Sequence, residues 1–233
     1  MTNEAIILIE NPTNSKGSSP KPSPLSKVNN HPFLHYQLQF LDENIFEHIV
    51  IMVNGDTENY KKEFGEKYLD IHIEYLKYDP ELKSTGNILK ALNSISSPMV
   101  FIIKGSSYFR LNYKKADDFR RMRNSRLLLI SKQMEDVSHF EEIKLNEKGQ
   151  IKAIGGLGEN SGLGAINTDY FLVNTRYFRT QFAEKKGMLF EDYFKTSYQD
   201  EPLFSFVCKQ YFIDIQNQKD IEKAKDDFKE NYF

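Results

Sequence analysis

Four short apolar runs, separated by longer amphipathic segments, constrain the fold of this chain more than any other feature. The runs are AIILI, HIVIMV, IHIEYL and MVFIIK. Each is nearly continuous in Ile, Val, Leu or Phe, which is typical of strands covered on both faces. The segments between them, PFLHYQLQFLDEN, TENYKKEFGEKYL and STGNILKALNSI, have helical patterns. This alternation predicts right-handed βαβ units on a parallel sheet.

The second half of the chain has shorter and more closely spaced strand candidates. These are RLLLISK, FEEIKL, QIKAI, YFLVN, LFSFV and YFIDI, with the turn NEKG between the second and third. MLFEDYFKTS has a helical pattern, and NQKDIEKAKDDFKENY reads as a closing helix capped near Asn217. No repeat or linker divides the chain. We therefore expect an α/β fold in a single domain over residues 1–233, with a sheet that is parallel first and mixed later.

Composition excludes several classes of protein. The 31 Lys and Arg residues nearly balance the 33 Asp and Glu residues, so the net charge of −2 gives no overall attraction for nucleic acid or anionic membranes. The single Cys208 excludes an intramolecular disulfide and a cysteine-rich metal site. The N-terminus lacks the basic region of a signal peptide, and no apolar stretch reaches the ~18 residues of a membrane span. We expect a cytoplasmic protein that binds no nucleic acid and has no membrane span.

Two loops could bind an anionic ligand. The loop after a first strand is a phosphate-binding position in open α/β sheets, and this one contains Lys16 and Lys21 in ENPTNSKGSSPKP. Its composition alone favours an ordinary surface loop, which stays the alternative. STGN, residues 84–87, reads as a helix start with Ser84 or Thr85 as cap, or as a place where Gly86 lets a ligand approach the backbone.

Two positions bear on metal-dependent chemistry. FIIKGSSYF is an apolar strand that runs into Gly105 and two serines, whereas a metal site at a strand end calls for a carboxylate. Asp214 lies within the apolar run YFIDI, where an unpaired carboxylate is costly, so we expect it to be paired or functional. The five histidines show no zinc-type spacing.

Taken in order, these segments resemble the sugar-1-phosphate nucleotidyltransferase family, particularly its heptose-phosphate and mannose-phosphate guanylyltransferase-like members. The resemblance runs from Ala5 to about Asp227. AIIL, PKP and HPFLHYQLQFL match the family's first strand, nucleotide loop and first helix. STGN resembles Gly-Thr-Gly-Gly, IIKGSSYF falls where the family has an apolar run ending Asn-Gly-Asp-Thr, and AINTDYFLV resembles the Asn-Ala-Gly strand. YFIDIQNQKDIEKA follows the closing Phe-Ile-Asp-Ile-Gly-Thr-Pro-Glu-Asp segment.

The resemblance implies a Rossmann-like nucleotide-diphospho-sugar transferase fold, with a mixed, mostly parallel central sheet flanked by helices. It assigns residues 1–110 to nucleotide binding and residues 111–233 to the sugar phosphate. The family joins a nucleoside triphosphate to a sugar 1-phosphate with release of pyrophosphate, as a step toward surface polysaccharide, and two aspartates hold Mg²⁺. By this resemblance Lys21 is catalytic and Asp214 is a metal ligand. The nucleotide contacts are Leu8, Ile9, Glu10, Lys16, Gly17, Ser84, Thr85, Gly86, Asn87, Gly105 and Ser106, and the sugar-phosphate contacts are Asn167, Thr168 and Asp169.

The departures from the family pattern concentrate at the phosphates and the metal. Ser106 stands at the first metal aspartate, and its neutral hydroxyl cannot balance Mg²⁺ charge. The nucleotide loop is shorter, lacks the family arginine and contains Glu10, while Thr168 and Asp169 replace two small residues. GGLGENSG replaces Glu-Lys-Pro, and IDIGT has become IDIQN. Loss of ~4 kcal/mol of transition-state stabilisation slows a reaction about a thousandfold, so we expect reduced or lost activity.

Three functions follow from this interpretation. The chain is a divergent nucleotidyltransferase that holds Mg²⁺ with Asp214 and the substrate phosphates, or a pseudoenzyme that binds a nucleotide sugar as a regulatory or scaffolding subunit. The third alternative is a metal-independent glycosyltransferase. The expected partner is a nucleotide or nucleotide sugar, and the cofactor is Mg²⁺ if the protein is active and none otherwise. A homo-oligomer and a hetero-oligomer with an active homologue both stay open.

Overall fold

The four apolar runs form the parallel part of the sheet in the computed structural model, which describes residues 2–10, 22–138, 140–155 and 162–229. They are β1 (Glu4–Ile9), β4 (His48–Val53), β6 (Ile71–Lys77) and β7 (Met99–Lys104). Their order is β7-β1-β4-β6, and all three pairings are parallel. The predicted βαβ organisation is confirmed. A two-residue strand, β5 (Lys67–Tyr68), adds antiparallel to β6 at the edge.

The long strand β12 (Gly164–Asn174) joins this parallel part to the second half of the chain. It pairs antiparallel with β7 on one side and with β9 (Leu127–Met134) on the other. β13 (Phe204–Cys208) runs parallel to β9, while β10 (Glu142–Leu145) pairs with β12 and with β11 (Ile151–Gly155). The result is a mixed ten-stranded sheet of the Rossmann-like type predicted from the sequence.

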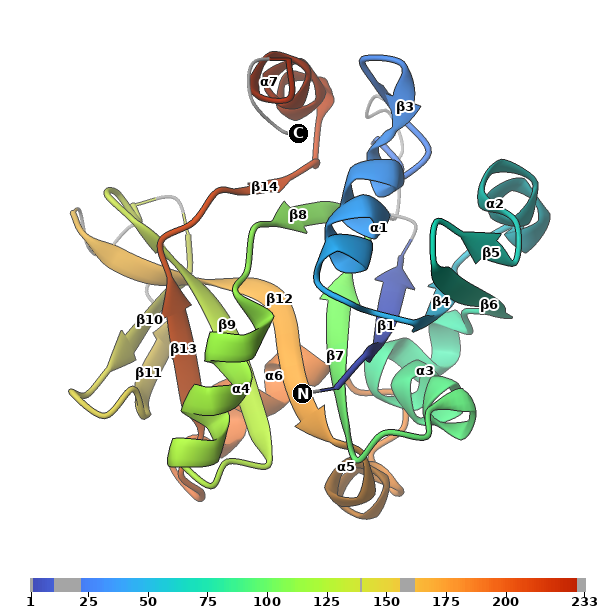
Figure 1. Ribbon diagram of the computed structural model, residues 1–233. Helices are drawn as coiled ribbons and strands as arrows, with labels where there is room; N and C mark the ends of the chain where they lie inside the picture. The colour runs from blue at the N-terminus through green and yellow to red at the C-terminus, as the bar shows by residue number, and fades with distance from the viewer. Residues whose placement is uncertain (1, 11–21, 139, 156–161, 230–233) are drawn as a thin grey trace.

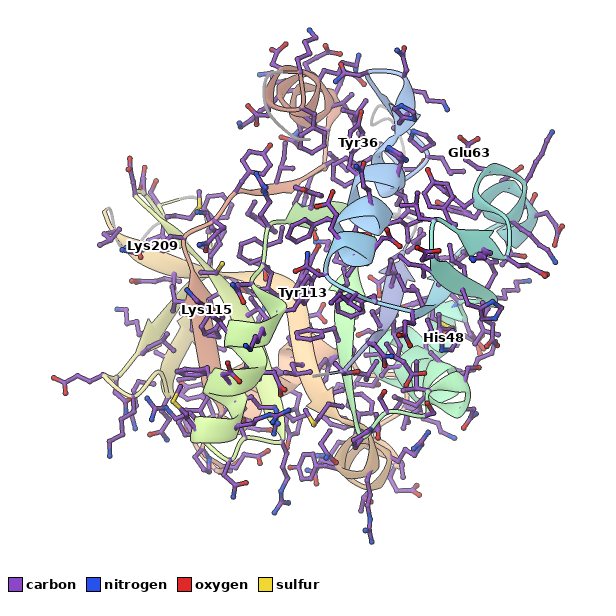
Figure 2. The ribbon with its side chains drawn as sticks, in the orientation of Figure 1. Tyr36, His48, Glu63, Tyr113, Lys115 and Lys209 are labelled. Atoms are coloured by element: carbon purple, nitrogen blue, oxygen red, sulfur yellow. The ribbon has the colours of Figure 1, made fainter. Side chains whose placement is uncertain are left out.

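Helices cover both faces of the sheet. α1 (Phe33–Glu43), α2 (Thr57–Phe64) and α4 (Tyr113–Met122) supply residues to one apolar core, and α3 (Lys83–Ala91), α5 (Thr175–Phe182) and α6 (Phe190–Ser197) supply residues to another. Ile7 of β1 belongs to the first core and its neighbour Ile6 to the second, because successive strand side chains point to opposite faces. Figure 1 shows α1 and α4 on the near face and α6 behind the sheet, and Figure 2 shows Tyr113 of the near core.

A small third layer lies beyond the carboxyl ends of β1 and β7. β8 (Ser107–Phe109) pairs antiparallel with β14 (Phe212–Asp214), and α7 (Gln218–Asp227) follows. The hairpin of β2 (Lys27–Val28) and β3 (His31–Pro32) leads into α1. A capping box at Asn217 and Asp220 starts α7, which confirms the predicted cap. Figure 1 shows β8, β14 and α7 above the arrowheads of β1 and β7.

Two local predictions are wrong. The helix expected over TENYKKEFGEKYL ends at Phe64, because Gly65 adopts a φ of +71° and the chain turns into β5. Neither Ser84 nor Thr85 caps α3, since a 3₁₀ turn at Pro80–Leu82 precedes the helix and Leu82 occupies the cap position. Neither β8 nor α5 was predicted from the sequence.

Two wider points concern the whole chain. Within the described part of the chain, no helix is both long and apolar enough to cross a membrane. The expectation of one domain over residues 1–233, with its two halves, stays a prediction.

Candidate functional site

A pocket of about 250 Å³ lies at the carboxyl ends of β1 and β7. Apolar side chains from both flanking strands and from the helices behind the sheet form part of its wall: Leu8, Ile88, Ile102, Phe171 and Phe190. Polar and charged side chains form another part: Glu10, Ser84, Lys104, Ser106, Asp169, Glu191 and Gln216. Ligand sites in open α/β sheets lie at this edge, so the position agrees with the sequence interpretation.

Gly105 fixes the turn that presents the two residues beside it to the pocket. A Cβ atom at this position would lie 2.6 Å from Cγ1 of Ile9 and 3.1 Å from the carbonyl oxygen of Leu8. The Gly105 amide donates a hydrogen bond to that same carbonyl at 2.8 Å. The glycine is therefore required for close contact between the end of β7 and β1.

Gln37 of α1 holds the same turn from the opposite side of the sheet. Its Nε2 donates to the carbonyl oxygens of Lys104 at 3.0 Å and Ser107 at 2.6 Å. Gln37 is 2% exposed, so these hydrogen bonds are shielded from water. The amide of Ile215 donates to the Ser106 carbonyl at 2.8 Å, which joins the turn to the segment after β14. The positions of Lys104 and Ser106 are thus set by buried polar contacts.

Lys104 lies between two carboxylates that come from distant parts of the chain. Its Nζ is 3.0 Å from Oδ2 of Asp169 and 3.1 Å from Oδ2 of Asp214. Burial alone would lower the lysine pKa, but the two carboxylates outweigh it and raise the pKa above its usual range. The ammonium therefore stays protonated at neutral pH.

Asp214 accepts hydrogen bonds from three side chains. The Ser106 hydroxyl donates to Oδ1 at 2.7 Å, while Lys104 and Nε2 of Gln216 both donate to Oδ2, the latter at 2.5 Å. Its side chain is 16% exposed. The prediction that this carboxylate is paired is confirmed.

A bulge in β12 brings Asp169 to the pocket. The register with β9 passes from Asn167 opposite Ser131 to Tyr170 opposite Ile130, which leaves Thr168 and Asp169 outside the pairing. Asp169 has a φ of +55°, a left-handed conformation that Asp tolerates better than most residues. Asn167 fixes it in two ways, donating from Nδ2 to Oδ1 of Asp169 at 2.7 Å and accepting from the Asp169 amide at 2.9 Å.

Glu191, in the first turn of α6, is a second acid in the pocket wall. Burial raises its pKa from 4.5 to about 7, and the negative charges of Asp169 and Glu10 add to this effect. Carboxyl groups with such pKa values serve as proton donors or acceptors near neutral pH. Ser84 supports this part of the wall, because its Oγ accepts a hydrogen bond from the amide of Phe190 at 2.7 Å.

The structure brings some of the predicted nucleotide contacts to the pocket and leaves others away from it. Leu8, Ile9, Glu10, Ser84, Ser106 and Asp169 line the pocket. Gly105, Asn167 and Asp214 stand directly behind that lining, while Thr168 is buried and donates from Oγ1 to the carbonyl of Ile130. Lys16, Gly17 and Lys21 lie outside the described residues. The functional roles of all these residues stay predictions.

Thr85, Gly86 and Asn87 are buried in α3 instead of lining the pocket. The Thr85 hydroxyl bonds the carbonyls of Lys185 and Met188. The Asn87 amide group donates to the carbonyls of Asp79 and Lys83 and accepts from the Asp79 amide. A Cβ at Gly86 would lie 2.7 Å from Cβ of Leu82, so this glycine serves helix packing. Thr85 thus ties the α3 segment to the loop before α6, and Asn87 ties it to the turn that precedes the helix.

Sequence reasoning missed Lys104, Glu191 and Gln216 as pocket residues. Lys104 reads as an ordinary strand-terminal lysine, and Glu191 as one acid in an amphipathic helix. The available signal was a set of departures from the family pattern that occur together. Lys104 and Ser106, on either side of Gly105, stand where the resembled family has Asn and Asp, and Gln216 stands where it has Gly.

The described residues do not fit the Mg²⁺ that the family resemblance implies. Mg²⁺ takes oxygen ligands in octahedral geometry, with carboxylates as its protein ligands. At this position the aspartate that would bind it is surrounded by three hydrogen-bond donors, and the second carboxylate is replaced by the Ser106 hydroxyl. Among residues 2–10, 22–138, 140–155 and 162–229, no three His, Cys, Asp or Glu side chains are arranged to hold a metal ion.

Comparisons with known proteins agree with the fold. No family model matches the chain. The D-glycero-alpha-D-manno-heptose 1-phosphate guanylyltransferase of Aneurinibacillus thermoaerophilus is 25% identical over 224 residues, which are 95% of this chain and 96% of the relative. The enzyme of the same name from Campylobacter jejuni is 23% identical over 83% of this chain and 85% of its own. The chain is thus similar over most of its length to sugar-1-phosphate guanylyltransferases.

Solved structures support the fold of this nucleotidyltransferase homologue. HddC from Yersinia pseudotuberculosis has a TM-score of 0.80 at 20% identity, covering 97% of this chain and 99% of its own. Its complex with GMP-PN has a TM-score of 0.79. The inositol-1-phosphate CTP transferase from T. maritima has a TM-score of 0.66 at 15% identity over 98% of this chain and 97% of its own.

Proposed function

We propose that this nucleotidyltransferase homologue binds a nucleotide or nucleotide sugar in the pocket above β1 and β7, and joins nucleoside triphosphates to sugar 1-phosphates slowly or not at all. The sequence relatives and the position of the pocket support ligand binding. Because both curated relatives are named as heptose 1-phosphate guanylyltransferases, guanine nucleotides with heptose or mannose 1-phosphate are the first ligands to test.

The hydrogen bond from Ser106 to Asp214 is the observation on which the low activity rests. In the resembled family two carboxylates at these positions hold the Mg²⁺ that offsets the charge of the triphosphate. In this chain the Ser106 hydroxyl donates a hydrogen bond of 2.7 Å to Oδ1 of Asp214, so the pair acts as a donor and an acceptor instead of two anions. Removal of one carboxylate weakens binding of the cation that balances developing phosphate charge, which costs a large factor in rate.

The pocket wall suits a sugar or nucleoside better than a bare triphosphate. Its apolar part, which includes Phe171 and Phe190, can pack against a ring, and its acids can accept hydrogen bonds from hydroxyl groups. Glu10, Asp169 and Glu191 lie in this wall against the one cation Lys104, counting the described residues alone. Their combined charge opposes the high negative charge of a bare triphosphate more than that of a ligand with fewer phosphate charges.

Two measurements test the proposal. Purified protein is screened by thermal shift against nucleoside mono-, di- and triphosphates and their mannose, glucose and heptose derivatives. The same ligands, as triphosphate plus sugar 1-phosphate, are then assayed for pyrophosphate release. We expect a shift with at least one guanine ligand and turnover far below the 1–10³ s⁻¹ that is roughly typical of enzymes. Turnover within that range would refute reduced activity, and no shift with any ligand would refute nucleotide binding.

The raised pKa of Glu191 favours a second candidate, a metal-independent glycosyltransferase. A carboxylate with a pKa of about 7 in the pocket could accept the proton of an acceptor hydroxyl as a sugar is transferred. This candidate predicts that a nucleotide sugar is consumed in EDTA when a sugar acceptor is added, and that Glu191→Gln abolishes the reaction. A silent regulatory subunit would bind the nucleotide sugar and consume none of it with any acceptor.

A further inference from the structure

We propose that Lys104 is the protein's own substitute for a divalent cation: its ammonium group excludes the metal and supplies positive charge to a phosphate of the ligand in the pocket. The exclusion of metal is argued from residues of this chain and does not depend on the proposed function. The contact with a ligand phosphate rests on the proposed function.

The ammonium group is held where two carboxylates converge. Nζ lies 3.0 Å from Asp169 and 3.1 Å from Asp214, and the lysine side chain is 33% exposed and lines the pocket. An ammonium group has three N–H donors, and these two contacts use two of them. Counting contacts with the described residues alone, one donor is left for a group that enters from the pocket.

The surroundings of Asp214 favour an ammonium over a metal. A metal ligand oxygen needs a free lone pair directed at the cation, yet Ser106 and Gln216 also donate to this carboxylate. A cation placed beside Oδ2 would meet the positive charge of Lys104 and would have to displace two donors. A hydroxyl, an ammonium and an amide together occupy three of the roughly four lone-pair sites of the Asp214 carboxylate, and the ammonium charge repels a metal ion there.

Asp169 shows that the second carboxylate is a built part of the arrangement. It sits in the β12 bulge with a φ of +55°, and Asn167 contacts both its side chain and its amide. Residues in sparsely populated backbone conformations persist only when their surroundings enforce them, and they cluster at functional sites. The bulge therefore places the Asp169 carboxylate beside Lys104, which also contacts Asp214.

Mn²⁺ titration tests the exclusion of metal, with calorimetry as the readout. We expect wild-type protein to bind Mn²⁺ more weakly than about 1 mM, the weak end of oxygen-ligand cation sites. The double variant Lys104→Asn/Ser106→Asp should bind it at least about tenfold more tightly. The single variant Ser106→Asp should stay as weak as wild type, because Lys104 remains. Wild-type binding tighter than about 100 µM would overturn the proposal.

GDP and guanosine test the contact with phosphate, each measured in EDTA and in Mg²⁺. We expect wild-type affinity for GDP to be equal in the two conditions. Lys104→Met should weaken GDP about tenfold or more and leave guanosine unchanged, since the lost contact is a charge-assisted one to phosphate. Lys104→Arg should retain most of the GDP affinity, and Lys115→Met on the exposed face of α4 is the matched control (Figure 2).

The two arms separate the possible failures. If wild-type protein binds GDP only with Mg²⁺, or Lys104→Met weakens GDP and guanosine equally, the proposed role of Lys104 is wrong. If no nucleotide binds at all, the proposed function and the phosphate contact both fail, and the Mn²⁺ arm still decides whether Lys104 excludes the metal. Circular dichroism is used to check that each variant is folded. The two wild-type titrations need no variant, so they test the proposal even if a variant fails to fold.

Discussion

Replacement of Glu191 by glutamine should stabilise the protein at high pH and leave it nearly unchanged at low pH. The folded state raises the pKa of this carboxyl from 4.5 to about 7, because of burial and then the negative charges of Asp169 and Glu10. An acid with a raised folded pKa makes no contribution below the unfolded value. Its ionisation then destabilises the folded state increasingly between pH 4.5 and about 7, and fully above that.

The size of the effect follows from the shift. A change in pKa from 4.5 to about 7 corresponds to about 3 kcal/mol at alkaline pH, and to less than about 1 kcal/mol at pH 5. Glutamine keeps the shape of the side chain and removes the charge, so Glu191→Gln should recover most of this. For a chain of this length the melting temperature should rise by about 6 to 12 °C at pH 8 and by about 3 °C or less at pH 5.

Glu4→Gln is the matched control with the opposite sign. Burial would raise the pKa of Glu4, but hydrogen bonds from His48, Ser97 and Ser96 outweigh it and lower the pKa to about 2. Its stabilisation is fully present above pH 4.5 and is lost as pH falls through about 2. Glu4 begins β1 and lies beside His48, which is labelled in Figure 2. Glu4→Gln should therefore destabilise the folded state by about 2 to 3 kcal/mol at both pH 5 and pH 8.

Melting curves of the wild type and both variants at pH 5 and pH 8 decide the question. We expect the difference in melting temperature between Glu191→Gln and wild type to grow from pH 5 to pH 8. The difference between Glu4→Gln and wild type should stay nearly constant. A Glu191→Gln variant that is equally stable at both pH values, or less stable than wild type at pH 8, would show that this carboxylate is not destabilised by its surroundings.

Three further substitutions test the contacts that position the pocket, each by urea unfolding. Gly105→Ala should cost about 2 kcal/mol because the new methyl group meets Ile9, and an unchanged midpoint would contradict the close contact. Ser84→Ala should cost about 1 kcal/mol, since it leaves the Phe190 amide without its acceptor, and Ser84→Thr should lose less. Asn217→Ala should cost about 1 kcal/mol through loss of the cap of α7, whereas Asn217→Asp should be neutral.

The parallel strands could be predicted from the sequence because burial on both faces leaves a direct record in residue type. β1, β4, β6 and β7 are runs of apolar residues with clear ends. The end of α2 was harder, since the pattern continues through Gly65 and only the backbone conformation of that glycine stops the helix. The parallel strands could thus be predicted from residue type, whereas the length of α2 depended on the φ angle of Gly65.

The pocket could be predicted only in part. The residues that follow β7 could be placed at the edge of the sheet from their position after an apolar run. The roles of Ser84 and Thr85 could not, because their hydroxyls contact residues at and just before the start of α6, a hundred or more residues away. Lys104 has the same difficulty, because Asp169 becomes its neighbour through a bulge in β12 that no local pattern predicts.

The bulge in β12 has a consequence for how this pocket can change over evolution. It places two residues, Thr168 and Asp169, outside the pairing with β9. Because the insertion is an even number of residues, the alternation of faces resumes in phase, and Tyr170 and Phe171 enter their separate cores as they would in an unbroken strand. A substitution at residue 169 thus alters the pocket without shifting the strand. The residues that determine the chemistry of the pocket at this edge can therefore change during evolution while the fold is kept.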